Sequence, residues 1–187
     1  MNKQVIGKLT ALKQLKQAYL QQMFPQMGER VPRVRFSGFT EDWEERKLGD
    51  CFGYASSKHT ANNFLQTIGG HPLFDANKQI GEIALFDQEN PYVSIIKDGA
   101  GVGRLTKRNA KTSIIGTMGY LLPLCDLDFG FAYLQTVNFN DFVTGTTIPH
   151  IYYKDYSYKT MLTPTLPEQT AIGSFFRILD ELIALHQ

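Results

Sequence analysis

The fold of this chain is indicated most clearly between residues 92 and 123, which contain three short runs: Tyr92-Val93-Ser94-Ile95-Ile96, Thr112-Ser113-Ile114-Ile115-Gly116-Thr117 and Gly119-Tyr120-Leu121-Leu122-Pro123. The runs are rich in β-branched and aromatic residues, and glycine, proline and asparagine separate them, which is typical of strands joined by turns. The same pattern extends over residues 45–163. We therefore expect a β-rich domain in the middle of the chain.

Outside this middle part, apolar residues follow the period of an α-helix. In residues 2–24 they recur every three or four positions, and the segment carries four lysines and no acid before Pro25, which ends a helix. Residues 167–187 repeat the pattern, with Pro167 and Glu168 suited to a first helical turn. The apolar repeat is still running at the last residue, which indicates a helix cut in mid-pattern.

The two terminal helices differ in charge, which bears on how they pack. The first has a local charge of +4 from four lysines, and the last has −2 from three acids and one arginine. Because both are amphipathic, an antiparallel or intermolecular helix pair would bury their apolar stripes. The alternative is that each helix packs separately on the central domain. One further helix is expected from Phe129 to Phe139.

The size, overall charge and apolar pattern of the chain indicate which classes of protein it can belong to. The 187 residues include 19 basic and 18 acidic side chains, so a formal charge of +1 creates no global field that would attract nucleic acid or a membrane. The length suits one domain with appendages. No apolar run could span a membrane, no signal peptide is visible, and Cys51 and Cys125 lack metal or redox spacing. We expect an α+β fold, with one β-rich globular domain flanked by long amphipathic helices, in a cytoplasmic protein without membrane contact.

Patterns that resemble catalytic or cofactor motifs lack the context that those motifs need. Gly99-Ala100-Gly101-Val102-Gly103 would need a following helix to hold a dinucleotide phosphate, but residues 104–111 are polar, so a glycine-rich turn is the better interpretation. Asn90-Pro91-Tyr92 lacks the second proline of the adenine-methyltransferase tetrapeptide, and we interpret it as a strand start. The four histidines are scattered without metal-ligand spacing. We expect no catalytic residue, metal site or cofactor in this chain.

Three polar segments carry residue types that contact DNA in other proteins. Residues 97–111 hold five basic side chains against one acid, and residues 57–63 and 144–150 are polar clusters. Basic side chains bind phosphates, and Asn, Thr and Arg can also read base edges. Ordinary solvated loops are the alternative. The candidate DNA-binding residues are Lys58, His59, Asn62, Asn63, Lys97, Arg104, Lys107, Arg108, Lys111, Thr144, Thr146, Thr147 and His150.

A resemblance to a known family favours the DNA interpretation. Arg33-Val34-Arg35-Phe36-Ser37-Gly38-Phe39-Thr40-Glu41-Asp42-Trp43, continuing to Asp50, is similar to the segment that leads into a recognition domain of type I restriction-modification specificity subunits. Leu20-Gln21-Gln22-Met23-Phe24-Pro25 resembles the end of the helix before a second recognition domain. Gly145-Thr146-Thr147-Ile148-Pro149-His150 and the stretch from Pro164 to Gln187 resemble the approach to the exit helix and its start.

The resemblance implies domain limits. It assigns residues 1–24 to the end of a spacer helix, 25–47 to a linker leading into the domain, 48–163 to a target-recognition domain and 164–187 to the start of the distal helix. Within the linker, Trp43 could stack on bases, but packing of the domain against its helix is the better interpretation. A specificity subunit of this family has two such domains, each reading half of a split site, and its long helices pair as a coiled-coil spacer.

The resemblance also implies partners. The specificity subunit has no catalytic centre; modification subunits methylate adenine with S-adenosylmethionine, and restriction subunits add cleavage that uses ATP and Mg²⁺. This chain resembles half of such a subunit, so we expect it to recognise double-stranded DNA within the complex. A homodimer through the terminal helices would read an inverted repeat. A fragment or silent cassette copy that only binds the modification subunit, or only dimerises, is the alternative.

Overall fold

The computed structural model describes residues 3–62 and 69–186, which form a mixed fold of helices and sheets with a β-rich part, as the sequence predicts. The described chain divides into two compact units. Unit 1 consists of Met1–Arg46, Cys125–Val137 and Thr160–Gln187. Unit 2 consists of Lys47–Leu124 and Asn138–Lys159. Residues 125–137 and 160–163, which were expected within the recognition domain of residues 48–163, lie in unit 1.

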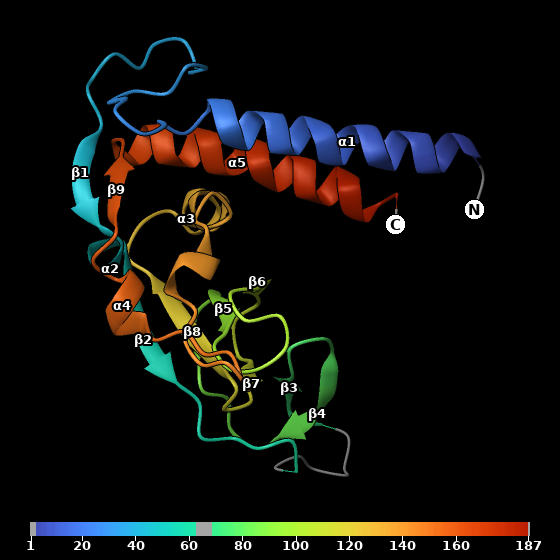
Figure 1. The fold of residues 1–187 in the computed structure, drawn as a ribbon. Helices are drawn as coiled ribbons and strands as arrows, with labels where there is room; N and C mark the ends of the chain where they lie inside the picture. The colour runs from blue at the N-terminus through green and yellow to red at the C-terminus, as the bar shows by residue number, and fades with distance from the viewer. Residues whose placement is uncertain (1–2, 63–68, 187) are drawn as a thin grey trace. The chain divides into compact units, whose positions relative to one another are not determined.

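Three helices form most of unit 1: α1 (Lys3–Gln22), α3 (Leu127–Leu134) and α5 (Leu166–Ala184). α1 and α5 lie side by side and antiparallel (Figure 1). The rings of Tyr19 and Phe175 meet edge to face with centroids 4.9 Å apart, and the Lys16 ammonium bonds to the Asp180 carboxylate. The expected antiparallel pair is therefore confirmed within one chain, and α5 also packs on α3.

The linker after α1 is fastened to α5 by a buried ion pair. Arg35 donates from Nε and Nη2 to the two carboxylate oxygens of Glu168, at 2.6 and 2.8 Å, and the Glu168 side chain is only 1% exposed. These hydrogen bonds raise the pKa of the guanidinium. Trp43 is buried beside Phe24 and Phe129, so the prediction that its indole packs inside the protein is confirmed.

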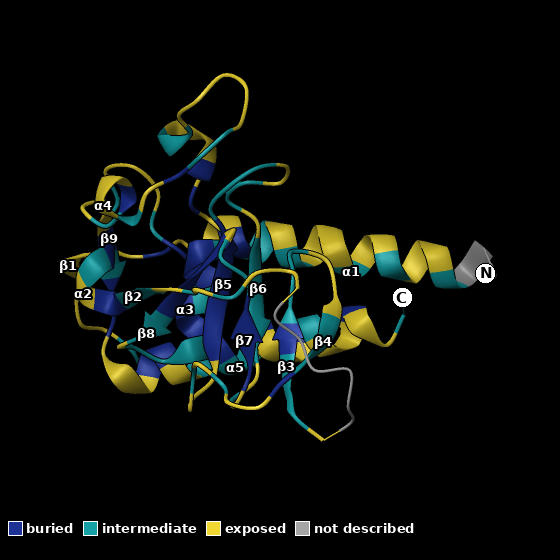
Figure 2. Cartoon of the chain, turned by 90° about the horizontal axis from the view of Figure 1, so that it is seen from below, coloured by how far each residue is buried: buried dark blue, intermediate teal, exposed yellow. Residues whose placement is uncertain are grey.

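The main sheet of unit 2 is antiparallel, with the strand order β2-β8-β5-β6. Its strands are β2 (Phe52–Ser56), β8 (Met118–Pro123), β5 (Tyr92–Ile96) and β6 (Leu105–Arg108). Every residue of β5 is buried, and the strand is dark blue in Figure 2. Tyr92, Ile96, Met118 and Tyr120 pack in one apolar cluster with Ile114, so the first and third of the runs recognised in the sequence are the two central strands.

A smaller sheet in unit 2 joins β4 (Gln79–Ile83), β3 (His71–Phe74) and β7 (Ser113–Ile114). β3 pairs antiparallel with β4 and parallel with β7, so the second run of the sequence forms an edge of this sheet. Glu82 accepts hydrogen bonds from the backbone N–H groups of Gly70 and Gly69, both at 2.8 Å, and these bonds lower the pKa of its carboxyl group.

Short elements complete the fold. They are β1 (Glu44–Lys47), α2 (Leu48–Cys51), the 3-10 helix η1 (Phe139–Phe142), α4 (Tyr153–Tyr156) and β9 (Thr160–Thr163). β1 pairs with β9. In unit 2, the N–H of Gly49 donates to Ser157 O at 2.9 Å, and the Tyr153 hydroxyl donates to Phe52 O. These bonds fix the segment around α4 to the start of β2.

Local expectations from the sequence are confirmed at two positions, and at a third the expected helix is present with different bounds. Gly99, Gly101 and Gly103 have positive φ and form turns that lead into β6, and Asn90-Pro91 precedes β5 directly. The helix expected from Phe129 to Phe139 instead runs from Leu127 to Leu134. It ends early because side-chain groups of Gln135 and Thr136 occupy carbonyls of its last turn.

Candidate nucleic-acid interface

A hollow of about 530 Å³ opens on unit 2 between β3 and the segment that includes β6 and continues to Thr112. Among its described lining residues, none is acidic and four can carry positive charge: His71, Lys107, Arg108 and Lys111. We call it the basic hollow. A concave surface lined by one sign of charge concentrates ions of the opposite sign, so this site suits a phosphate group.

Two of the predicted DNA contacts are engaged with the protein itself. Arg104 donates from Nη2 to Ala76 O and to Asn77 Oδ1, at 2.5 and 2.8 Å. Arg108 donates to Ser94 Oγ at 3.2 Å and to a carbonyl of the β3–β4 turn, and its guanidinium lies over the Phe74 ring. Burial lowers the pKa of Arg108. Both arginines therefore stabilise the β3–β4 turn beside the basic hollow.

Lys111 combines a charge with a strained backbone. Its φ of 58° is the only positive value at a non-glycine residue in the described part of the chain. The conformation is held by a hydrogen bond from its N–H to Gln88 O at 2.8 Å, and its ammonium lies 3.9 Å from the exposed Glu89 carboxylate. A left-handed conformation costs an L-residue about 1–2 kcal/mol, and such strain often accompanies a functional position.

The predicted segment at residues 144–150 is a closed loop. The backbone N–H of Thr144 donates to His150 O and that of His150 donates to Thr144 O, both at 2.8 Å. Between these ends, Thr146, Thr147 and Ile148 are exposed. The structure thus brings four of the predicted residues, Thr144, Thr146, Thr147 and His150, to one loop and adds Ile148, which was not among the predicted contacts.

Asp98, which directly precedes the glycine-rich turn, contacts both His150 at the end of this loop and the neighbouring Lys97. Its carboxylate lies 2.7 Å from His150 Nδ1 and 3.2 Å from Lys97 Nζ. The backbone adds two links, from Gly99 N–H to Pro149 O and from the N–H after His150 to Lys97 O, both at 2.9 Å. The predicted residues Lys97 and His150 therefore lie together, and the acid between them is a residue that charge alone would not have suggested.

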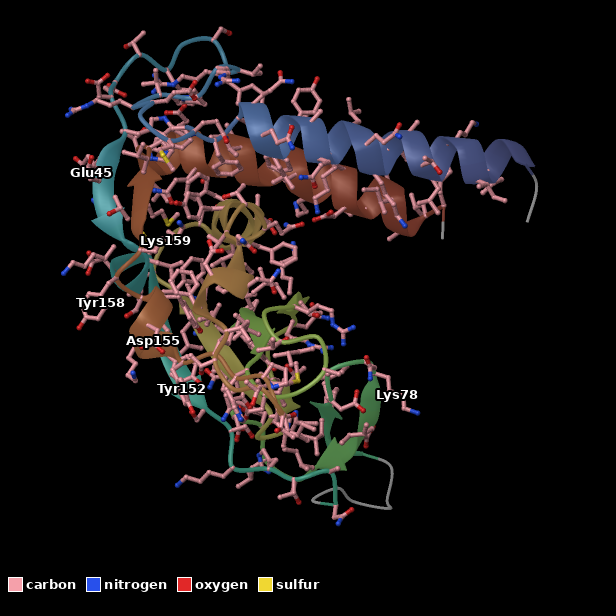
Figure 3. The ribbon with its side chains drawn as sticks, viewed as in Figure 1. Glu45, Lys78, Tyr152, Asp155, Tyr158 and Lys159 are labelled. Carbon is pink, nitrogen blue, oxygen red and sulfur yellow. The ribbon has the colours of Figure 1, made fainter. Side chains whose placement is uncertain are left out.

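Beside this cluster lies a second hollow, of about 350 Å³, that is lined mainly by tyrosines and lysines. We call it the tyrosine hollow; its lining residues are Tyr54, Ser56, Lys97, Asp98, Ile151, Tyr152, Tyr153 and Lys154. The rings of Tyr54 and Tyr153 stack with centroids 4.8 Å apart. Tyr152, Asp155 and Tyr158 lie along the same outer edge of unit 2, around α4 (Figure 3). The alternation of aromatic and basic residues after His150 was the available sequence signal for this surface.

The third predicted segment, residues 57–63, makes its side-chain contact with Asp87 and not with residues of the two hollows. His59 Nε2 is 3.0 Å from Asp87 Oδ1, and the other oxygen of Asp87 accepts a hydrogen bond from the buried Tyr120 hydroxyl. Burial raises the pKa of that hydroxyl, so it remains a donor at neutral pH. Lys58 and Asn62 are exposed. Asn63, also a predicted contact, lies outside the described residues.

The described residues form neither a metal-binding cluster nor a membrane-spanning helix. No three histidine, cysteine, aspartate or glutamate side chains in residues 3–62 and 69–186 come together as a metal site. No helix in these segments has the length and apolar character that crossing a membrane requires.

Comparison with solved structures shows a shared fold. The type I restriction-modification system S subunit from M. genitalium matches with a TM-score of 0.62 at 20% identity, over 79% of this chain and 41% of that one. The HsdS subunit from Thermoanaerobacter tengcongensis matches with a TM-score of 0.66 at 18% identity, over 98% of this chain and 47% of that one. A structure described as showing complex assembly and conformational transition of the type I R-M system has a TM-score of 0.72, at 18% identity over 98% and 47%.

This chain therefore spans less than half the length of each of these relatives. No curated protein matches it. Residues 40–187 match the family model described as the type I restriction modification DNA specificity domain. That match covers most of the chain, both of the hollows and the 144–150 loop. The chain belongs to the family of type I restriction-modification DNA specificity domains.

Proposed function

We propose that this chain recognises a specific sequence in double-stranded DNA as part of a type I restriction-modification complex. One observation carries the proposal: within a specificity-domain fold, the basic hollow gathers positive groups with no acid among its described lining residues. Phosphates of a duplex are the natural ligand for such a surface. Lys107 and Lys111 are the residues that we assign to phosphate contact.

Arg104 and Arg108 have a supporting part in this proposal. Their guanidinium groups hold the β3–β4 turn, so they shape the wall of the basic hollow. Loss of either would change DNA binding through the geometry of that wall. This view differs from the simpler one in which every basic residue of segment 97–111 binds phosphate directly.

Catalysis belongs to other subunits in the proposed complex. Modification subunits would bind S-adenosylmethionine and methylate adenine, and restriction subunits would use ATP and Mg²⁺ for cleavage. This chain would recognise the target DNA sequence, and the complex would act in the cytoplasm. Its α1–α5 pair is the surface that we assign to subunit contact. Ile178, Leu182 and Leu185 are exposed on α5 at helical spacing, which supports either a modification subunit or a second copy of the chain on that face.

The test measures how DNA affinity depends on salt. The chain is co-expressed with its modification subunit, and binding to duplex DNA is followed by fluorescence anisotropy over a range of salt concentrations. Each phosphate contact contributes about 0.9 to the slope of log K against log salt, so Lys107→Ala with Lys111→Ala is expected to reduce the slope by about 1.8.

A matched pair of exposed lysines elsewhere in unit 2 provides the control. Lys47→Ala with Lys159→Ala removes the same charge outside the basic hollow and is expected to leave the slope unchanged. Equal slopes for both double variants would contradict the assignment of the basic hollow. A complex that forms but binds no DNA would favour the alternative, a fragment that only binds its partner or dimerises.

A further inference from the structure

We infer that Asp87 is a positioning residue of the basic hollow, because it connects the buried Tyr120 hydroxyl to the segment that holds Lys111. Asp87 and Tyr120 are not among the described lining residues of the hollow. The inference rests on the proposed function, in which Lys111 contacts a phosphate. It adds that this lysine is held in its binding conformation from the core of unit 2, by groups that do not touch DNA.

Lys111 depends on the segment before β5 for its conformation. Its N–H donates to Gln88 O at 2.8 Å, and its ammonium lies 3.9 Å from the Glu89 carboxylate. Gln88 also forms an antiparallel bridge with Thr112. A left-handed conformation needs such support, because it is disfavoured at a residue with a β-carbon. Residues 84–91 contain no helix and only this isolated bridge, so the place of the segment depends on other bonds.

Asp87, the residue before Gln88, supplies those bonds. Its N–H donates to Ser113 Oγ at 2.8 Å, and one of its carboxylate oxygens accepts a hydrogen bond from the Tyr120 hydroxyl. Ser113 is fully buried, and Tyr120 is only 1% exposed. A hydrogen bond to an ionised carboxylate is stronger than one between neutral groups. The carbonyl that holds Lys111 is therefore one residue away from an anchor in the core.

The Tyr120 hydroxyl is suited to this anchor because it is bonded on both sides. It accepts from the Ile114 N–H at 3.0 Å while it donates to Asp87. Burial raises the pKa of the hydroxyl, so it keeps its proton at neutral pH. The second carboxylate oxygen of Asp87 lies 3.0 Å from His59 Nε2. His59, a predicted DNA contact, thus contributes its ring nitrogen to the same network.

Simple electrostatics predicts the opposite effect for Asp87. If this carboxylate only repelled phosphates, Asp87→Asn would strengthen DNA binding. If Asp87 positions Lys111, the same variant is expected to weaken binding, because a neutral amide is a poorer partner for the Tyr120 hydroxyl. Tyr120→Phe is the cleaner variant, since it keeps the buried ring and changes no charge. Stronger binding by Asp87→Asn would overturn the positioning role.

Hydrogen exchange tests the positioning without DNA. In Tyr120→Phe, the protection of the Lys111 amide is expected to fall roughly threefold to tenfold, as for the loss of one hydrogen bond. The amides of β2 report global unfolding and should change less. Tyr133→Phe is the matched control, because it removes a hydroxyl that donates to Thr160 O at 3.3 Å in unit 1. This control should leave the Lys111 amide unchanged.

A double-mutant cycle tests the consequence for DNA binding in the complex with the modification subunit. Tyr120→Phe alone is expected to lower the salt slope by up to about 0.9, which is the contribution of one phosphate contact. In a chain that already carries Lys111→Ala, it is expected to lower the slope no further, because that contact is already lost. An equal loss in both backgrounds would overturn the inference, since Tyr120 would then act on DNA by another route.

The two measurements separate this inference from the function on which it rests. If the Lys111 amide keeps its protection in Tyr120→Phe, the inference is wrong whatever the DNA result. If the protection falls but the unchanged complex binds no DNA, the proposed function is wrong, while the link from Tyr120 to Lys111 stands. Loss of protection, a lower slope and no further effect beside Lys111→Ala would support both.

Discussion

Replacement of Lys111 by glycine should weaken DNA binding without destabilising the protein. Its φ of 58° is a conformation that glycine adopts freely and a β-carbon disfavours. In the middle of a helix or strand, glycine makes a protein less stable than alanine does by about 0.5–1 kcal/mol. At this position the order is expected to reverse, so that Lys111→Gly is more stable than Lys111→Ala.

The size of the reversal follows from three contributions. Relief of the left-handed strain favours glycine by about 1–2 kcal/mol. The greater freedom of glycine in the unfolded chain opposes this by about 0.4–1 kcal/mol. Loss of the ion pair with Glu89, at 3.9 Å and with both side chains more than half exposed, is common to both variants and worth only about 0–0.5 kcal/mol. The net difference is about 0.5–1 kcal/mol, or roughly 1–4 °C in melting temperature for a chain of this size.

The two variants should lose DNA affinity to the same extent, although they differ in stability. Both variants remove the same charge from the basic hollow, so each should lower the salt slope by about 0.9, which changes the effect of raising salt from 50 to 200 mM by roughly threefold. Calorimetry or thermal melting gives the stability order, and anisotropy titrations with the modification subunit present give the slopes. If the affinity losses of the two variants followed their melting temperatures, a role of Lys111 through charge would be refuted.

Other substitutions test the framework. Glu168→Gln leaves Arg35 facing a neutral partner in a buried site, and urea unfolding should show a loss of about 3 kcal/mol. Gly103→Ala places a Cβ 2.7 Å from Phe139 Cβ at a φ of +84°, so the melting temperature should reflect a loss of roughly 2–4 kcal/mol. Because hydrogen bonds lower the folded-state pKa of Glu82, its contribution is present above the unfolded-state pKa and fades as pH falls through the folded-state pKa; the stability of Glu82→Gln should therefore depend less on pH in that window, as acid titration of the unfolding free energy would show.

The sequence predicts the elements whose cause is local. β5 and β8 are recognisable because β-branched and aromatic residues crowd into short runs, and α5 because its apolar residues keep a period of three to four. The end of α3 could not be predicted, because the side chains of Gln135 and Thr136, the two residues that follow it, bond to carbonyls of its last turn. Local composition carries no information about such a stop.

The sequence predicted which residues of the candidate site are charged, but it could not predict their hydrogen-bond and ion-pair partners. Arg104 and Arg108 stand out in the sequence as basic residues, yet their partners lie about 30 residues earlier, in the β3–β4 turn. Asp98 was visible only as the one acid of a basic segment, and its link to His150 spans 52 residues. Tyr152 gains its position from α4, which begins directly after it. Contacts over such separations arise from the fold as a whole.

The hydrogen bonds of Arg104 and Arg108 to the β3–β4 turn have a consequence for the affinity of the chain for DNA. The chain has a net charge of +1, and two of the five basic side chains of segment 97–111 are engaged with carbonyl groups of the protein. The phosphate contacts proposed for unit 2 are those of Lys107 and Lys111, and so small a number of contacts gives only a shallow salt dependence. Under the proposed function, tight binding must therefore come from the assembled complex, while unit 2 contributes the choice of sequence. An isolated chain should accordingly bind duplex weakly and with a slope no steeper than about −3, whereas the complex with its modification subunit should show a much steeper one.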